Sequence, residues 1–257
     1  MPQDLSPIAR PAVSARPTGK PTGYLFDDTI YRALRELGLA VRIEFDIEDF
    51  KDFIRSTEWP IVNSAADPAF HDFAAGEVFW MRLSHRGETV ATQVFRMIMT
   101  DDYLGMIRDH SLFFGSHPSG FRDFRMLPSA DDVPRLGGLV VQLTGLYVRP
   151  DWRRARTADG MRLVAAWTRL SHSFTARNLM ADWSVSLLEQ HIATPRMIED
   201  LYGYPHAMRV CETYVPDFDR HEPVTLVWMS AEELVASVAS RPRPAGQPGP
   251  RVPHMAG

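Results

Sequence analysis

Arginine is concentrated in one short stretch of the chain. Residues 149–177 contain seven arginines and two acidic residues, Asp151 and Asp159, a local charge of +5 in a protein of net charge −4. The stretch joins an apolar run, Gly138–Val148, to an amphipathic run, Ala158–Ala176. A strand that turns directly into a helix presents free N–H groups and a positive dipole end, and arginine adds bidentate donors for phosphate. The pattern predicts a site for an anionic ligand, with a solvated charged face as the alternative.

The turn itself resembles that of the GNAT superfamily of acyltransferases. In that family a strand ending in Val-x-Pro is followed by Arg or Gln, two residues, Gly, one residue, Gly or Ala, and then a helix. Val148, Pro150, Arg153 and Ala158 fall on this pattern. The resemblance implies that acyl-CoA is the co-substrate and that the turn binds it, through Val148, Arg153, Arg154, Ala155, Arg156, Thr157 and Ala158. Arg154 and Arg156 stand where the family has glycine, so side chains are expected to replace backbone contacts to the pyrophosphate.

The same resemblance implies direct transfer of the acyl group to an amine, with a carboxylate as base and a tyrosine as acid for the thiolate. The position of the family's tyrosine holds Glu199 here, so Tyr202, beside Gly203, is the candidate acid, with Tyr204 as an alternative. The candidate bases are Asp182 and Glu212, on the strands expected to flank the cleft.

Acyl-homoserine-lactone and N-acyl amino acid synthases are similar in having a large N-terminal half. Gln142 and Gly145 occupy the places where those enzymes carry a Glu and an Arg. We expect Gln142, Thr144 and Ser184 to line the substrate channel.

The expected acceptor is a small amine or amino acid. Two alternatives remain open: a donor carried by acyl carrier protein or by charged tRNA, which an arginine-rich turn also suits, and a catalytically inactive GNAT-like binding or regulatory module. The sequence indicates no oligomeric state.

Composition limits the class of protein. The 257 residues are 45% hydrophobic and 23% charged, as in a globular domain rather than a disordered chain. No run is long enough for a membrane helix, so neither membrane insertion nor export is expected, and the single cysteine, Cys211, suits the cytoplasm and a buried apolar position. No histidine motif predicts a metal site.

We predict one GNAT-like domain over 24–240, with an elaborated N-terminal half and flexible, proline-rich tails at 1–23 and 241–257. The predicted fold class is α/β (α+β): a mixed, mainly antiparallel sheet with flanking helices and one parallel strand–helix–strand crossover. Helices are predicted at Thr29–Leu37 (capped by Asp28), Glu48–Ser56, Asp101–Asp109, Ala158–Ala176, Arg196–Leu201 and Ala231–Ala239. Strands are predicted at Ala40–Phe45, Glu77–Ser84, Thr89–Ile98, Gly138–Val148, Leu179–Leu188, Ala207–Val215 and Pro223–Met229, with a loop over Gly115–Arg135.

Overall fold

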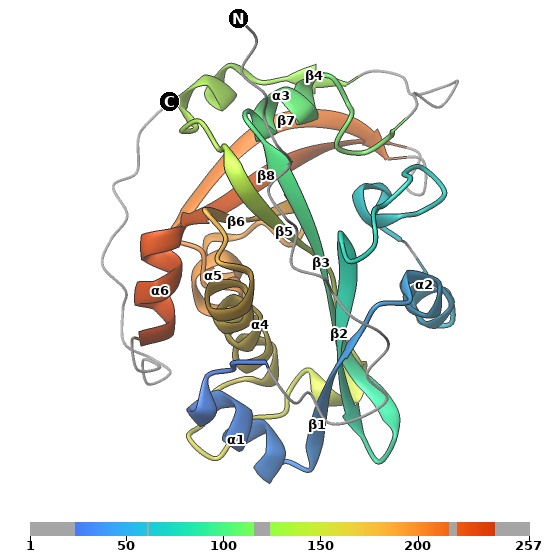
Figure 1. The fold of residues 1–257 in the computed structure, drawn as a ribbon, viewed down its shortest axis with the longest axis vertical. Helices are drawn as coiled ribbons and strands as arrows, with labels where there is room; N and C mark the ends of the chain where they lie inside the picture. The colour runs from blue at the N-terminus through green and yellow to red at the C-terminus, as the bar shows by residue number, and fades with distance from the viewer. Residues whose placement is uncertain (1–23, 61, 116–123, 216–219, 240–257) are drawn as a thin grey trace, which may run out of the picture.

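A computed structural model describes residues 24–60, 62–115, 124–215 and 220–239. Within these ranges eight strands form one curved sheet in the order β1-β2-β3-β5-β6-β8-β7-β4 (Figure 1). Neighbouring strands pair antiparallel except β5 and β6, which are parallel. The predicted mixed sheet with a single parallel crossover is therefore confirmed. The predicted tails lie outside the described residues.

The first half of the chain follows its local signals. The side chain of Asp27 accepts hydrogen bonds from the backbone N–H groups of Thr29 and Ile30, so Asp27 is the N-cap of the first helix. The predicted cap, Asp28, is wrong by one residue. Asp46 caps the second helix in the same way. The elements are α1 (Asp28–Glu36), β1 (Leu39–Glu44), α2 (Ile47–Arg55), a 3₁₀ turn at Ser64–Ala66, β2 (Val78–His85) and β3 (Glu88–Thr100).

The region between β3 and β5 contains a short strand and a 3₁₀ turn in addition to the predicted helix. A short helix, α3 (Tyr103–Arg108), is followed by β4 (Arg125–Met126) and a 3₁₀ turn at Pro128–Asp132. Two residues of β4 pair with β7 at the edge of the sheet. The predicted loop over Gly115–Arg135 is therefore partly wrong, because a strand this short carries no periodic signal, and residues 116–123 lie outside the described part.

The second half contains the main correction. β5 (Gly138–Val148) has the predicted bounds, but the following helix, α4 (Leu163–Phe174), begins five residues later than predicted. It continues as a π-helical turn over Thr175–Leu179, so Leu179 is helical and β6 starts only at Trp183. The remaining elements are β6 (Trp183–Glu189), α5 (Pro195–Met197) with a π-helical turn at Ile198–Tyr202, β7 (His206–Val215), β8 (Arg220–Ser230) and α6 (Ala231–Ala239).

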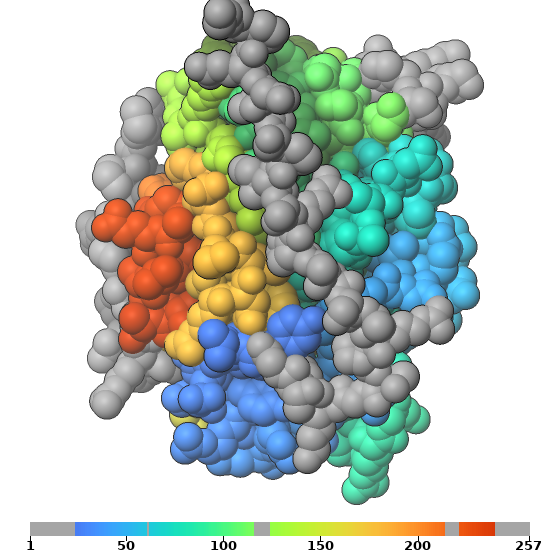
Figure 2. Space-filling model, in the orientation of Figure 1, coloured from blue at the N-terminus to red at the C-terminus, as the bar shows by residue number. Residues whose placement is uncertain are grey.

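Helices cover both faces of the sheet. The helices α1, α4, α5 and α6 lie on one face and α2 on the other (Figure 1), and in the space-filling view α6, the α4–α5 region and α1 lie side by side (Figure 2). Trp167 and Phe174 of α4 are buried against Phe79 and Phe95 of the hairpin. Because α4 is fixed to the β3–β5 side of the sheet in this way, its N-terminus is held near the end of β5.

Candidate functional site

The two parallel strands stay together over only three residue pairs. Val140, Val141 and Gln142 of β5 pair with Trp183, Ser184 and Val185 of β6, and beyond them β5 pairs only with β3 and β6 only with β8. The strands thus part at Gln142 and leave an opening toward their carboxyl ends. Unpaired N–H and C=O groups along such an opening are available to a ligand that lies between the strands.

Gly145 and an irregular register explain why β5 turns away. The β3–β5 pairing shifts between Thr92 and Val94, and Gly145 has φ of +59°. A Cβ on Gly145 would lie 2.7 Å from Phe50 Cζ and 2.8 Å from Val94 Cγ2. Only glycine fits both the backbone angle and the space, so this residue permits the local bend of β5.

Polar side chains are buried where the strands part. Gln142 is fully buried, and neither its Oε1 nor its Nε2 has a hydrogen-bond partner among the described residues. Its neighbours Val141 and Leu143 point into the core under α4, so Gln142 points to the opposite face of the sheet. An unpartnered buried amide costs about 1–3 kcal/mol. Its donor and acceptor are therefore available to a ligand that reaches this point.

A second polar group lies on the α4 face at the same level. The buried hydroxyl of Tyr204 lies 3.4 Å from Ser184 Oγ, and the Tyr204 ring contacts His172 of α4 at 4.9 Å between centroids. Burial raises the pKa of Tyr204, so the hydroxyl stays protonated at neutral pH. The structure thus brings Ser184 together with Tyr204, the alternative tyrosine of the sequence prediction.

The turn after β5 does not run straight into a helix. The backbone N–H groups of Arg153, Ala155 and Thr157 donate to Pro150, Trp152 and Met161 within the loop, which contains a tight turn at Thr157–Gly160. These three backbone donors are therefore used within the loop, and acyl-CoA binding by Val148–Ala158 stays a prediction. Free backbone donors lie at the later start of α4, where the N–H groups of Val164 and Ala165 have no acceptor among the described residues.

Most arginines of the turn already have partners. Arg149 bonds Glu88 and Asp151, and Arg156 donates to the carbonyl of Gly160 at 2.7 Å. Arg154 and Arg162 are exposed and have no partner in the described part of the chain. These two side chains, with the start of α4, are the positive groups free to hold an anion. Ala158 is exposed beside them, whereas Thr157 is buried and bonds Asp159 and Met161.

Arg153 is held by a residue far away in sequence. Its Nη2 lies 2.5 Å from Glu58 Oε1, its Nε donates to the Val148 carbonyl, and Tyr147 donates to the other Glu58 oxygen at 3.0 Å. Burial alone would raise the pKa of Glu58, but its hydrogen bonds, including that from Tyr147, and the Arg153 charge lower it. Glu58 is thus one of three carboxylates at the end of β5, where Glu88 and Asp151 bind Arg149.

The residue after Glu58 reaches the other strand. Trp59 stacks on His191, which follows β6, with ring centroids 6.3 Å apart. The segment 58–59 therefore contacts the loops at the ends of both parting strands. Sequence reasoning missed it; the available signal was a tryptophan beside Pro60 in a segment following a helix.

The other predicted residues lie elsewhere. Asp182 is at the closed end of β6, where its carboxylate accepts from the Leu139 N–H at 2.7 Å, and Glu212 lies on β7, opposite Arg125 of β4. Neither is brought to the opening. Tyr202 packs beside the cluster of Leu188 and Ile198, and burial raises its pKa to about 12. Thr144 is two residues beyond Gln142 on the same strand, half-buried, with its carbonyl bonded to Gln93.

Two surface hollows lie away from the opening: one of about 450 Å³ on α1, and one of about 380 Å³ near the start of β6. We place the candidate site at the opening because the buried unpartnered amide of Gln142 lies where the strands part, and the exposed Arg154 and Arg162 lie between the end of β5 and the start of α4. Within the described ranges, no group of three or more His, Cys, Asp or Glu side chains is arranged to hold a metal ion, and no helix is long and apolar enough to cross a membrane.

Comparison with known proteins finds similarity only at the level of structure. No protein-family model and no curated protein matches the sequence. Among solved structures the chain is similar to a polyamine N-acetyltransferase of Drosophila melanogaster, at 13% identity and a TM-score of 0.38 over 74% of this chain and 99% of that one. It is also similar to an aminoglycoside N(6′)-acetyltransferase of Legionella pneumophila, at 8% identity and a TM-score of 0.42 over 77% of this chain and 95% of that one. A CoA-dependent acyl-homoserine lactone synthase is similar at 13% identity and a TM-score of 0.40, over 81% of this chain and 87% of that one.

At these identities and scores the likeness concerns the arrangement of the chain only. The donor, the acceptor and the roles of residues in this protein are inferred from its own geometry.

Proposed function

We propose that the protein transfers an acyl group from a thioester donor, acyl-CoA, to the nitrogen of a small amine or amino acid. The observation that carries this proposal is the parting of β5 and β6 at Gln142, with the start of α4 beyond the end of β5. An extended thioester arm suits the space between two strands whose backbone groups lack partners, and the phosphates of CoA suit Arg154, Arg162 and the N-terminus of α4.

The chemistry requires one bond to form and one to break. The neutral amine nitrogen attacks the thioester carbonyl, the C–N bond forms, the C–S bond breaks, and the nitrogen loses a proton as the thiolate gains one. Tyr204 is the side chain that supplies a proton to the thiolate in this proposal, because its hydroxyl is buried and protonated beside Ser184. Gln142 offers one donor and one acceptor to orient the reacting groups.

Glu58 is the carboxylate best placed to receive the proton from the amine, through water. Its lowered pKa keeps it ionised but makes it a weak base while it is bound to Arg153. The acceptor amine is therefore expected to enter from the side of Glu58 and Trp59, opposite α4.

Donor binding is tested by thermal unfolding with CoA, acetyl-CoA and longer acyl-CoAs. A ligand at 100 times its Kd stabilises the native state by about 2.7 kcal/mol, which raises the Tm of a protein of this size by several degrees. We expect this shift in the natural protein, and its loss in the double variant Arg154→Ala, Arg162→Ala. Arg108→Ala, an exposed arginine on α3, is the matched control.

Arg153 and Arg156 are unsuitable for this test, because they bond Glu58 and Gly160 and their loss would disturb the loop. If no CoA thioester shifts the Tm, the CoA proposal fails. Binding of acyl carrier protein or charged tRNA instead would identify the donor as one of those, and an unshifted Tm with all donors would favour an inactive binding module.

A further inference from the structure

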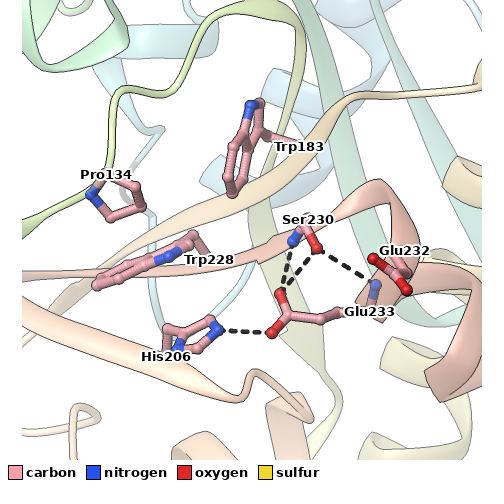
Figure 3. Close-up of a pocket in the computed structure, with 7 residues that line it drawn as sticks. All are labelled: Pro134, Trp183, His206, Trp228, Ser230, Glu232 and Glu233. Carbon is pink, nitrogen blue, oxygen red and sulfur yellow. Dashed lines mark hydrogen bonds and ion pairs between the residues drawn. The ribbon is translucent and has the colours of Figure 1, made fainter.

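The hollow near the start of β6 is separate from the opening between β5 and β6. It is an open hollow of about 380 Å³ and is lined by Pro134, Trp183, His206, Trp228, Ser230, Glu232 and Glu233 (Figure 3). Trp183 is the first residue of β6 and pairs with Val140, at the end where the two parallel strands are still joined. A ligand here would not occupy the proposed acyl-transfer site.

Two tryptophans form walls of this hollow. Trp183 pairs with Ser230 and Val185 with Trp228, so both indoles project from the same face of neighbouring strands. Figure 3 shows Pro134 and His206 on opposite sides of the Trp228 ring. The His206 ring stacks on Trp228 at 5.3 Å and 19°. The hollow is therefore bounded by aromatic surface and by one proline ring.

The ionisable side chains that line the hollow are two carboxylates and one histidine. Glu233 is engaged: it accepts from Ser230 N and Oγ as the cap of α6, and it bonds His206 Nε2 at 2.6 Å. Glu232 is exposed and has no partner among the described residues. No lysine or arginine lines the hollow. The positive end of the α6 dipole lies here as well, and the Glu233 carboxylate offsets it.

We propose that this hollow binds an organic cation, an alkylated ammonium group held against the ring of Trp183, beside the covered Trp228, with Glu232 as its counter-ion. The faces of tryptophan attract a cation through their quadrupole, and the methyl groups of an alkylammonium fill an apolar space without needing hydrogen-bond acceptors. An anionic ligand meets two carboxylates, and a neutral polar ligand finds few free partners. The carboxylates and the indoles thus select the same class of ligand.

The test is a titration with choline, followed through the six indole N–H signals in a nitrogen-correlated NMR spectrum. The signals of Trp183 and Trp228 are assigned by their absence from the spectra of Trp183→Leu and Trp228→Phe. We expect the chemical shifts of these two signals to change together, while those of the other indoles do not change. The neutral isostere 3,3-dimethylbutan-1-ol is expected to bind about tenfold more weakly, since it keeps the shape and loses the charge.

Two variants separate the aromatic and the ionic contributions. Trp183→Leu is expected to weaken choline binding about tenfold, and Glu232→Gln, which changes an exposed side chain, about threefold. Glu199→Gln, an exposed glutamate elsewhere, is the control. Equal affinity for choline and the neutral alcohol, or an unchanged affinity in Glu232→Gln, would overturn the assignment of a cation. Unmoved Trp183 and Trp228 signals up to about 100 mM choline would exclude the site.

Discussion

His172 shows how burial sets the state of a single side chain in the candidate site. It is 3% exposed and lies against the ring of Tyr204. Burial, and then the charge of Arg169, lower its pKa to about 4. The imidazole beside the proposed acid is therefore neutral at pH 7 and does not compete with Tyr204 as a proton donor.

This burial predicts a pH dependence of stability. The unfolded chain binds a proton at His172 below about pH 6.5, whereas the folded chain resists it until about pH 4. The contribution is fully present above pH 6.5, and on the order of 3 kcal/mol is lost as the pH falls to 4. Urea unfolding at several pH values measures it. His172→Gln should flatten the slope in this window; an equal slope in the natural protein and the variant would contradict the expectation.

At the same scale, the sequence indicates where positive charge gathers but not which charges are free. The cluster of arginines after Val148 is visible in the sequence. The sequence does not show that the charge of Arg153 is neutralised, because its partner Glu58 is 95 residues away along the chain. Gln142 was predicted to line the channel, and its position at the point of divergence agrees with that role, which remains a prediction. Asp182 looked suitable because it precedes a strand, yet its carboxylate bonds Leu139 at the closed end.

At the scale of elements, local signals predicted most strands and caps. The Ser230–Glu233 capping box and the stop at Gly203, with φ of +71°, are both present. The start of α4 was misplaced because the family pattern places the helix directly after Ala158, although the periodic apolar residues begin only at Met161. Asp159-Gly160 is a turn signal, and Gly160 has φ of +83°. Reading that dipeptide as a break would have moved the helix start, and with it the free backbone donors, to Leu163.

Gly145 provides the prediction at this scale. Gly145→Ala should destabilise the fold by about 3 kcal/mol, because the substitution adds a left-handed backbone penalty to a clash with Phe50 and Val94. Gly87→Ala is the matched control: it has φ of +88° with nothing within 4 Å, so it carries the backbone penalty alone, about 1 kcal/mol. Chemical denaturation measures both, and equal losses would show that crowding at Gly145 is unimportant.

At the scale of the whole molecule, the sheet consists of two antiparallel ladders joined by a short parallel seam. One ladder is β1-β2-β3-β5 and the other is β6-β8-β7-β4, and only the pairs Val140–Trp183 to Gln142–Val185 connect them. The sequence predicted the hairpin of β2 and β3 and the parallel crossover. The pairings of β3 with β5 and of β6 with β8 join strands that are not consecutive, and the length of the seam depends on a bend at Gly145 that no periodic pattern encodes.

A seam of this length predicts two units of local stability. In native-state hydrogen exchange with increasing denaturant, amides of β2, β3 and β5 should lose protection in one step, and those of β6, β7 and β8 in another. The core that both ladders share under α4 determines the difference in denaturant concentration between the two steps. A single step for all strands would show that the helices couple the ladders fully.

The seam also bears on how the chain folds as it is synthesised. Three of the four strands in the first ladder lie within residues 78–148 and the fourth precedes them, so this ladder is complete in the chain before β6 has been made. In the second ladder only β4 is made early, and it must wait for β7 at the far edge. A nascent chain can therefore bury the core of the first ladder before it forms the parallel pair that defines the candidate site.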